Sequence, residues 1–286
     1  MCNIHLIGGD DRELYLAENL KEKGYNVSLW GFDLKGFNKF DVGAIGESIQ
    51  PNDKIVFPMS GTSEHGVVKS QYSKEPIVVE ESFFIQLPQK TLICIGWARK
   101  WFLSLAEKYN CKVIEIAEDD ELAILNSIPS GEGAIQMAMD NSEITIHGSK
   151  AIVIGFGRCG TTLARMLQGL GAKVTIVTRN PVNLARAFEM GFYGIHPQKA
   201  KQHYSKAELI FNTAPSMVLD KKALESLKNV EVIIDIASAP GGVDFAYAKK
   251  IGIKALLAPG LPGIIAPKTA GKILSEVLPK FLKEER

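Results

Sequence analysis

A chain of 286 residues is long enough for two domains of ordinary size, each with its own core. Its composition, 46% hydrophobic and 23% charged, is that of a globular protein, and a net charge of +1 provides no overall field for nucleic acid or a membrane surface. The four cysteines have no metal-ligand spacing, and no apolar run reaches the roughly 18 residues of a membrane span. We therefore expect a cytoplasmic protein without a leader segment, with reduced thiols, no metal site, and neither nucleic acid nor membrane as partner.

The first half of the chain alternates apolar, strand-like runs with helix-like segments. Strands are expected at residues 3–7, 27–30, 54–57, 77–79, 91–95 and 112–116. Helices are expected at residues 14–20, where Gly24 follows as a stop, and at 97–109 and 119–127. This alternation predicts a parallel sheet covered by helices.

The second half repeats the pattern, with strands expected at residues 151–154, 174–177, 209–212, 232–236 and 255–258. The predicted fold class is α/β, with two Rossmann-like domains, each a parallel sheet covered by helices, and a cleft between them. We expect a substrate-side domain at residues 1–127, a dinucleotide-binding domain at 128–264, and a C-terminal helix at about 265–286 that packs back on the first domain. At the junction, Pro129 predicts a break before a helix that runs to about Met139.

The clearest motif is a glycine turn, residues 155–160, placed between an apolar run and a helix-like segment. Gly155 allows the sharp turn, Gly157 lets the backbone approach a pyrophosphate, and Gly160 lets helix and strand pack closely. The helix N-terminus, with Arg158 and Cys159, then binds the phosphates. Proximity to that N-terminus raises the alternative of a reactive Cys159 thiol, but a small residue that fits the turn is the favoured interpretation.

The end of the next strand reads Thr178-Arg179-Asn180. An NAD enzyme normally places an acidic residue here to bind the ribose 2′-hydroxyl, and this chain has none. A threonine hydroxyl, an arginine and an asparagine suit a 2′-phosphate instead. The sequence therefore predicts NADP as cofactor, with NAD less favoured.

Further candidates follow other strands, because open parallel sheets bind ligands at the carboxyl ends of their strands. The cofactor half contributes two predicted cofactor-binding segments, Asn212-Thr213-Ala214-Pro215 and Ala237-Ser238. Lys268, near a predicted helix start, is a candidate anion partner and catalytic residue, with a plain surface lysine as the alternative.

In the first half, Ser60, Gly61 and Thr62 follow a strand and are predicted to bind a carboxylate of the substrate. His65, next in that loop, is a candidate general acid or base. Arg12 is a candidate carboxylate clamp. At the junction, Asn126 and Glu132 are alternatives for orienting the substrate, with Glu132 also counted among the catalytic candidates.

Several motifs together resemble the A-subunit family of dipicolinate synthase, and the resemblance covers essentially the whole chain. They are Gly8-Gly9-Asp10, Asn126-Ser127-Ile128-Pro129, Glu132-Gly133-Ala134-Ile135, Gly155-Phe156-Gly157-Arg158, Pro240-Gly241-Gly242, and Leu257–Gly263 with Ala266–Ala270. The resemblance implies an enzyme in the mother cell of a spore-forming bacterium. That enzyme oxidises a dihydro- or hydroxytetrahydro-dipicolinate, a small cyclic dicarboxylate of the lysine-pathway branch, to pyridine-2,6-dicarboxylate, together with the second component of dipicolinate synthase, its B subunit.

The architecture is more distantly similar to D-2-hydroxyacid and alanine dehydrogenases, and by this analogy a homo-oligomer is expected. The former carry an arginine shortly after the strand that ends near Ile236, and a later catalytic histidine. Neither residue is present in Ser238–Gly242 or Ala258–Gly263, so ordinary hydroxyacid oxidation is disfavoured. The sequence leaves open a nucleotide-binding regulatory subunit without turnover, and another NAD(P)-dependent amino or hydroxy acid dehydrogenase.

Overall fold

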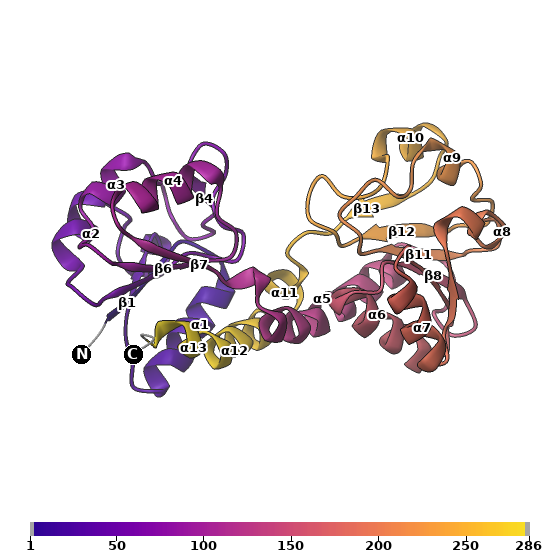
Figure 1. Cartoon of the computed structure of the whole chain (residues 1–286), viewed down its shortest axis with the longest axis horizontal. Coiled ribbons are helices and arrows are strands. Elements are labelled where there is room, and N and C mark those ends of the chain that lie inside the picture. Colours follow the sequence, from indigo (N-terminus) through magenta and orange to yellow (C-terminus); the bar gives the residue numbers. More distant parts are fainter. Residues whose placement is uncertain (1–2, 284–286) are drawn as a thin grey trace. The chain divides into compact units, whose positions relative to one another are not determined.

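The computed structural model describes residues 3–283, and the chain divides into two compact units. The first unit combines the residues up to Leu125 with those from Ala266 onward, and the second is Asn126–Ile265. Each unit is a parallel sheet with helices on both faces (Figure 1). This confirms the α/β fold class with two Rossmann-like domains.

The sheet of the first unit has the strand order β2-β1-β3-β6-β7, and all neighbours are parallel. Its strands are β1 (Asn3–Ile7), β2 (Asn26–Trp30), β3 (Lys54–Val56), β6 (Leu92–Ile95) and β7 (Lys112–Glu115). One face is covered by α2 (Val42–Ser48), α3 (Glu81–Ile85) and α4 (Lys100–Lys108), which share an apolar core with that face. Short 3-10 turns lie at η1 (Asp33–Lys35) and η2 (Ile116–Glu118).

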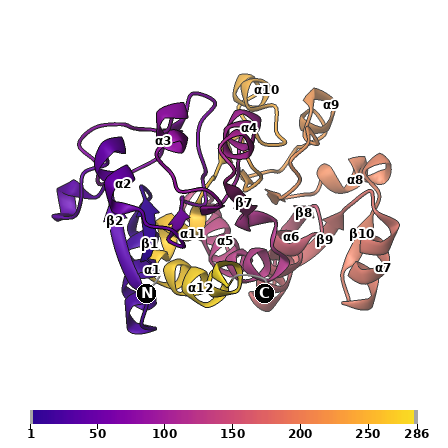
Figure 2. The same cartoon turned by 60° about the vertical axis from the view of Figure 1, so that its left-hand side comes forward.

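The other face of this sheet is covered by α1 (Asp11–Glu22) and by two helices from the end of the chain, α12 (Pro267–Val277) and α13 (Pro279–Leu282). Figures 1 and 2 show α12 running beside α1. The two helices approach closely at Gly271, where a Cβ atom would lie 2.6 Å from the Arg12 carbonyl oxygen. A glycine is therefore required at this crossing.

Residues 77–79, expected as a strand of the parallel sheet, lie elsewhere. β5 (Ile77–Val78) pairs antiparallel with β4 (Val67–Val68) in a separate two-stranded hairpin. The hairpin covers the carboxyl end of β1, because a Cβ atom on Gly8 would lie 2.8 Å from Val68 Cγ1. The apolar run signals burial correctly, but burial under a hairpin and burial within a sheet give the same short pattern.

The second unit has the strand order β10-β9-β8-β11-β12-β13, again all parallel. Its strands are β8 (Lys150–Ile154), β9 (Lys173–Val177), β10 (Tyr193–Ile195), β11 (Leu209–Asn212), β12 (Val232–Asp235) and β13 (Ala255–Leu257). Figure 1 shows α6 (Arg158–Gly169) and α7 (Pro181–Glu189) on one face, with α8 (Lys201–Tyr204), α9 (Lys221–Leu224) and α10 (Phe245–Lys250) on the other. The edge strand β10, the 3-10 turn η3 (Pro197–Lys199) and α11 (Leu261–Ile265) complete this unit.

The predicted break at Pro129 is wrong, because α5 (Asp120–Asp140) runs through it without interruption. Proline costs this helix one backbone hydrogen bond. The residues after it still pack, since Gly131, Ala134 and Ala138 are buried in the second unit. Burial of this face outweighs the local preference of proline for a helix end. In the described part of the chain, no helix is long and apolar enough to cross a membrane.

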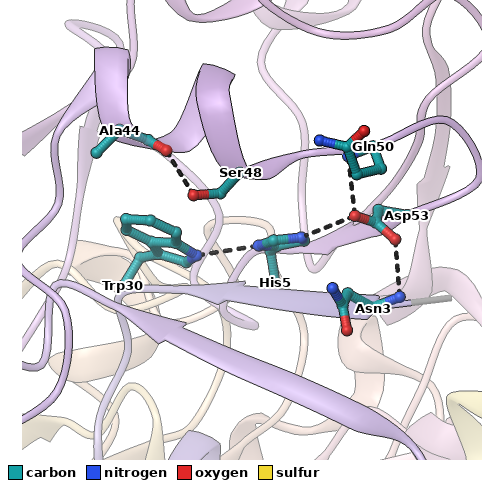
Figure 3. A network of polar contacts seen from close by, with 7 residues as sticks. All are labelled: Asn3, His5, Trp30, Ala44, Ser48, Gln50 and Asp53. Atoms are coloured by element: carbon teal, nitrogen blue, oxygen red, sulfur yellow. Dashed lines mark hydrogen bonds and ion pairs between the residues drawn. The ribbon is translucent and has the colours of Figure 1, made fainter. Parts of the chain in front are cut away.

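One polar network lies inside the first unit, and Figure 3 shows its members. Trp30 Nε1 donates a hydrogen bond to His5 Nδ1 (3.1 Å), which leaves His5 Nε2 to donate to Asp53 Oδ2 (3.3 Å). The Asp53 carboxylate also accepts from the backbone N–H groups of Asn3 (2.8 Å) and Gln50 (2.9 Å). The Asp53 carboxylate lies at the amino end of β3, away from the edge where such sheets bind ligands, and the groups around it are buried and hydrogen-bonded. We therefore interpret the network as structural.

Candidate dinucleotide site

The strand order of the second unit defines where a ligand is expected. β8 lies at the centre, and the chain continues to β9 and β10 on one side and to β11, β12 and β13 on the other. In such sheets the connections leave opposite faces at this point and open a crevice at the carboxyl ends of the two central strands. Here those ends are the glycine turn after β8 and the Asn212-Thr213 segment at the end of β11.

The three glycines of the turn have different surroundings. Gly155 has φ +91°, a conformation that favours glycine, and a Cβ atom there would collide with Thr213 Oγ1. A Cβ atom on Gly160 would collide with the carbonyl oxygen of Gly155. At Gly157, by contrast, an added Cβ atom meets no described atom within 4 Å apart from those of Gly157 and its two chain neighbours. Two glycines are thus needed by the fold itself, and the third borders open space.

The N-terminus of α6 faces the same turn. Gly157 is its N-cap residue, and no side chain among residues 3–283 caps the helix. An uncapped helix N-terminus with a glycine in front suits a diphosphate, because N–H groups and the helix dipole both favour negative charge. Arg158 begins the helix and is exposed. Burial raises the pKa of the Cys159 thiol above its ordinary value, which favours a small residue that fits the turn over an activated thiol.

The side chains after β9 divide into two kinds. Thr178 is 7% exposed, and its Oγ1 accepts a hydrogen bond from the Asn180 backbone (3.3 Å). Asn180 caps α7 by accepting from the Val182 N–H (2.9 Å). Both therefore hold the local turn. Arg179 is exposed, and within residues 3–283 its side chain has no ion-pair partner, so it is free to meet an anion.

A hydrogen bond between two buried side chains joins the loops that follow β11 and β12. Asn212 Nδ2 donates to Asp235 Oδ1 (2.8 Å), and both side chains are 0% exposed. Thr213 links the first loop to β8, since its Oγ1 donates to the Ile154 carbonyl (3.0 Å). Thr213 and Ala214 are half-buried, whereas Pro215 and Ser238 are exposed and Ala237 is buried. Asn212 thus lies beneath the residues that form the surface of the site, and Asp235 was not anticipated from the sequence.

The N–H groups of the Gly8-Gly9 loop in the first unit are already occupied. The Gly8 N–H donates to the Trp30 carbonyl (2.9 Å), the Gly9 N–H to the Lys69 carbonyl (2.8 Å), and the Asp10 N–H to Glu13 (2.7 Å). The Trp30 and Lys69 carbonyls and the Glu13 carboxylate therefore occupy the N–H groups that a phosphate would need. The predicted phosphate-binding turn of the second unit has no such occupied loop, because a Cβ atom on Gly157 would meet open space.

Arg12 does not suit the predicted role of carboxylate clamp. Its Nε and Nη2 atoms donate to the two oxygens of Asp10 (2.9 and 2.8 Å), and the residue is only 9% exposed. Beside this pair, burial raises the pKa of Glu13 to about 7. Asp10 and Glu13 form a capping box at the start of α1, so the cluster stabilises that helix. The sequence suggested a carboxylate clamp only because Arg12 is a cation that follows a strand.

The loop after β3 holds the predicted carboxylate-binding residues. Ser60 is exposed, Gly61 has φ +63°, and Thr62 is 3% exposed, with no hydrogen-bond partner for its Oγ1 among the described residues. The Thr62 carbonyl accepts from Arg99 Nε (3.3 Å), a half-exposed cation on the loop after β6. Arg99 was not singled out from the sequence, because only strand pairing brings the two loops together.

The predicted catalytic side chains are spread over both units. His65 is exposed in the β3 loop, and Lys268 is exposed on the first turn of α12, so both belong to the first unit. Glu132 is exposed on α5 in the second unit, where Asn126 is half-buried. The roles of these residues stay predictions. Within residues 3–283, no group of three or more His, Cys, Asp and Glu side chains is arranged to hold a metal ion.

Comparison with known proteins agrees with this geometry. Residues 127–244 match the family model of the D-isomer specific 2-hydroxyacid dehydrogenase NAD-binding domain. An L-alanine dehydrogenase structure superposes with a TM-score of 0.60 at 18% identity, over 98% of this chain and 89% of the other, a likeness of fold alone. The second unit is therefore the nucleotide-binding domain of a dehydrogenase-type oxidoreductase, with a nicotinamide dinucleotide as its cofactor.

The family is narrower than that class. Residues 3–117 match the family model of the N-terminal domain of the dipicolinate synthase A subunit. The chain is 41% identical to the dipicolinate synthase A subunit of Bacillus subtilis (strain 168), over 98% of this chain and 96% of that protein. The crystal structure of the Bacillus halodurans A subunit superposes with a TM-score of 0.90 at 40% identity, covering 99% of this chain and 98% of the other. The chain belongs to the A-subunit family of dipicolinate synthase.

Proposed function

We propose that this chain oxidises a dihydrodipicolinate, or a hydroxytetrahydro-dipicolinate that also loses water, to pyridine-2,6-dicarboxylate with NADP, working with a B subunit in the mother cell of a sporulating bacterium. The oxidation transfers a hydride to NADP and releases a proton. The observation that carries the proposal is full-length similarity to a component of dipicolinate synthase combined with an open glycine turn. Oxidation of a partly reduced ring to an aromatic pyridine is favourable in itself. The protein then needs to hold the ring, bind two carboxylates and take up a proton.

The residues of the second unit fit a nicotinamide dinucleotide. Gly157 leaves space for a diphosphate at the uncapped start of α6, and Arg158 adds an exposed positive charge. A bound nicotinamide supplies a hydride acceptor. Arg179 is available to pair with a 2′-phosphate, and no acidic side chain stands at residues 178–180 to repel one. These features support NADP over NAD.

The carboxylates of the substrate need cations or N–H groups. In the first unit we assign this role to Ser60 and Thr62, with Arg99 as the accessible cation in place of Arg12. The Arg99 side chain is half exposed although its Nη1 pairs with Glu64 (3.0 Å), so an incoming carboxylate can compete for it. The Thr62 hydroxyl is buried and has no hydrogen-bond partner among the described residues, so it can donate to a carboxylate once the loop opens toward the substrate.

Few side chains at the predicted cofactor segments of the second unit can take up a proton. The segments 155–160, 212–217 and 235–243 contain two titratable groups besides arginine. They are Cys159, with its raised pKa, and Asp235, which is fully buried and hydrogen-bonded. We propose the exposed His65 imidazole as the base, with the exposed Glu132 carboxylate on α5 as the other candidate.

The absence of an available base from these three segments also favours a second candidate function, a nucleotide-binding subunit whose partner performs the chemistry. One experiment separates the two. The purified chain, the B subunit and their mixture are each given the cyclic intermediate with NADP or NAD, and pyridine absorbance is followed. Product from this chain, alone or only in the mixture, with NADP preferred, supports the proposal. Turnover by the B subunit on its own, with NADPH binding but no turnover here, supports the second function.

Arg99→Ala tests the carboxylate assignment, with Arg12→Ala as its matched control. We expect Arg99→Ala to raise KM for the dicarboxylate with little change in thermal stability. Arg12→Ala should lower stability instead, because it leaves Asp10 half-buried without its partner. An unchanged KM in Arg99→Ala would remove this residue from the site.

A further inference from the structure

Two buried polar side chains end adjacent strands of the second sheet and face each other across the pair. Asn212 is the last residue of β11 and Asp235 the last of β12, and the two are partners in the strand register. Both are 0% exposed, and Asn212 Nδ2 donates to Asp235 Oδ1 (2.8 Å). Burying a carboxylate costs free energy unless its oxygens accept hydrogen bonds. The other groups that bond to Asp235 therefore indicate its structural role.

Those partners are all in the two loops that follow the strands. Asp235 accepts from the N–H groups of Ala237 (3.0 Å) and Gly242 (2.7 Å), and so closes the loop of residues 236–242 upon itself. Asn212 accepts from the Ala214 N–H (3.1 Å) and donates to the Ala214 carbonyl (3.0 Å). One side-chain pair therefore fixes the backbone of both loops.

The glycines of the Pro240-Gly241-Gly242 motif fit this pair closely. A Cβ atom on Gly241 would lie 2.6 Å from Asp235 Oδ2, and one on Gly242 would lie 2.6 Å from Asn212 Nδ2. The Gly242 carbonyl in turn accepts from the N–H groups of Val218 and Leu219, both at 2.9 Å. Hydrogen bonds thus join the two loops to each other and to the buried pair.

This body lies against the glycine turn. The Thr213 hydroxyl donates to the carbonyl of Ile154 at the end of β8, and a Cβ atom on Gly160 would lie 3.1 Å from its oxygen. A dinucleotide that crosses the sheet at this point has its diphosphate at the glycine turn and its two halves on opposite sides. The adenosine half belongs on the β9 side, near Arg179, and the nicotinamide half on the side of β11 and β12.

We propose that Asn212 and Asp235 are positioning residues that hold loops 213–216 and 236–242 in the shape that receives the nicotinamide half of the cofactor. The inference rests on the proposed function. Neither side chain touches the cofactor, because both are fully enclosed. Two apolar side chains would fill the same space, but they would leave the N–H groups of Ala214, Ala237 and Gly242 without these acceptors, and the loops free to take other shapes.

Asp235→Asn is the first test. It keeps the volume of the side chain but replaces one acceptor oxygen by an NH2 group, which cannot accept the hydrogen bond of the backbone N–H that it faces. Binding is measured by calorimetry with NADPH and with adenosine 2′,5′-bisphosphate, which contains the adenosine half alone. We expect Kd for NADPH to rise at least tenfold and Kd for the bisphosphate to stay within twofold. The fluorescence of bound NADPH, which reports how firmly the nicotinamide ring is held, should fall toward that of the free molecule.

Ile233→Val, a buried change on the same strand away from the loops, is the matched control and should alter neither Kd. Where Asp235→Asn does not fold, Asn212→Ala tests the same point, because it keeps both N–H bonds to Asp235. Equal weakening of both ligands, or no change in either, would overturn the inference. Failure of the unaltered protein to bind either ligand would instead overturn the proposed function.

Discussion

The Gly157→Val substitution tests whether glycine at this position is required for folding or for cofactor binding. The added side chain starts in space where, apart from Gly157 and its two chain neighbours, no described atom lies within 4 Å. The backbone at Gly157, with φ −86° and ψ −159°, is extended and open to any residue. A β-branched side chain therefore fits the unliganded protein but occupies the approach of a diphosphate.

The expected change in stability is small, because two effects oppose each other. Replacing glycine at a helix N-cap by an apolar residue costs about 0.5–1.5 kcal/mol. Removing glycine from the unfolded chain contributes about 0.4–1 kcal/mol in the other direction. The free energy of unfolding should thus change by less than about 1 kcal/mol, a few degrees in Tm at most.

The expected change in cofactor binding is large. Each hydrogen bond to a charged group contributes about 1.5–3 kcal/mol, so losing two N–H bonds to the diphosphate costs about 3–6 kcal/mol. That is at least a hundredfold in Kd for NADP and NAD alike. Calorimetry with each cofactor, and thermal unfolding of the same samples, provide the two measurements.

Gly160→Ala is the control with the opposite pattern. Its Cβ atom collides with the Gly155 carbonyl oxygen, so we expect a loss of about 1–3 kcal/mol in stability before any ligand is added. Normal cofactor affinity in Gly157→Val would refute the assignment of the turn. A large loss of stability in that variant would refute the claim that the space beside Gly157 is open.

Three further predictions concern separate sites. Arg179→Ala should weaken NADP binding by about 10- to 150-fold, the equivalent of 1.5–3 kcal/mol, and spare NAD; equal effects on both cofactors would contradict the assignment. Burial raises the pKa of Glu13 from 4.5 to about 7, so between these values the folded state keeps a proton that the unfolded chain has lost. The free energy of unfolding should therefore fall as pH rises through this window. The Glu13→Gln variant stays neutral, so its free energy of unfolding, measured with urea, should fall less steeply with pH. An unchanged slope against pH would exclude Glu13 as the cause. Trp30→Phe leaves His5 Nδ1 buried without its donor and should cost about 1–3 kcal/mol in unfolding free energy with cofactor affinity unchanged, whereas an unaltered stability would show that the hydrogen bond contributes little.

The nucleotide-binding turn was predictable because its determinants are local. The apolar run of β8, the glycines at 155, 157 and 160, and the amphipathic helix α6 follow one another within 20 residues of sequence. The spacing of the three glycines between strand and helix is visible in the sequence, although the atoms that require Gly155 include Thr213 on a later loop. The strands of both sheets were predicted for the same reason, apart from the short edge strand β10.

Other predictions failed where a local pattern was overridden by packing. Pro129 did not end α5, because the helix beyond it is buried. The apolar run at Ile77 is covered by a hairpin partner and not by the parallel sheet. Arg12 has the charge for a substrate clamp, but folding of α1 brings it against Asp10.

The sequence by itself determined the α/β class, the position of the glycine turn and the absence of an acid at residues 178–180. Only the tertiary structure decided which polar side chains remain available. Strand pairing places Asp235 beside Asn212, and loop packing places Arg99 beside Thr62. Hydrogen bonds of this kind join residues that are far apart in the chain, and no periodicity or motif spacing records them.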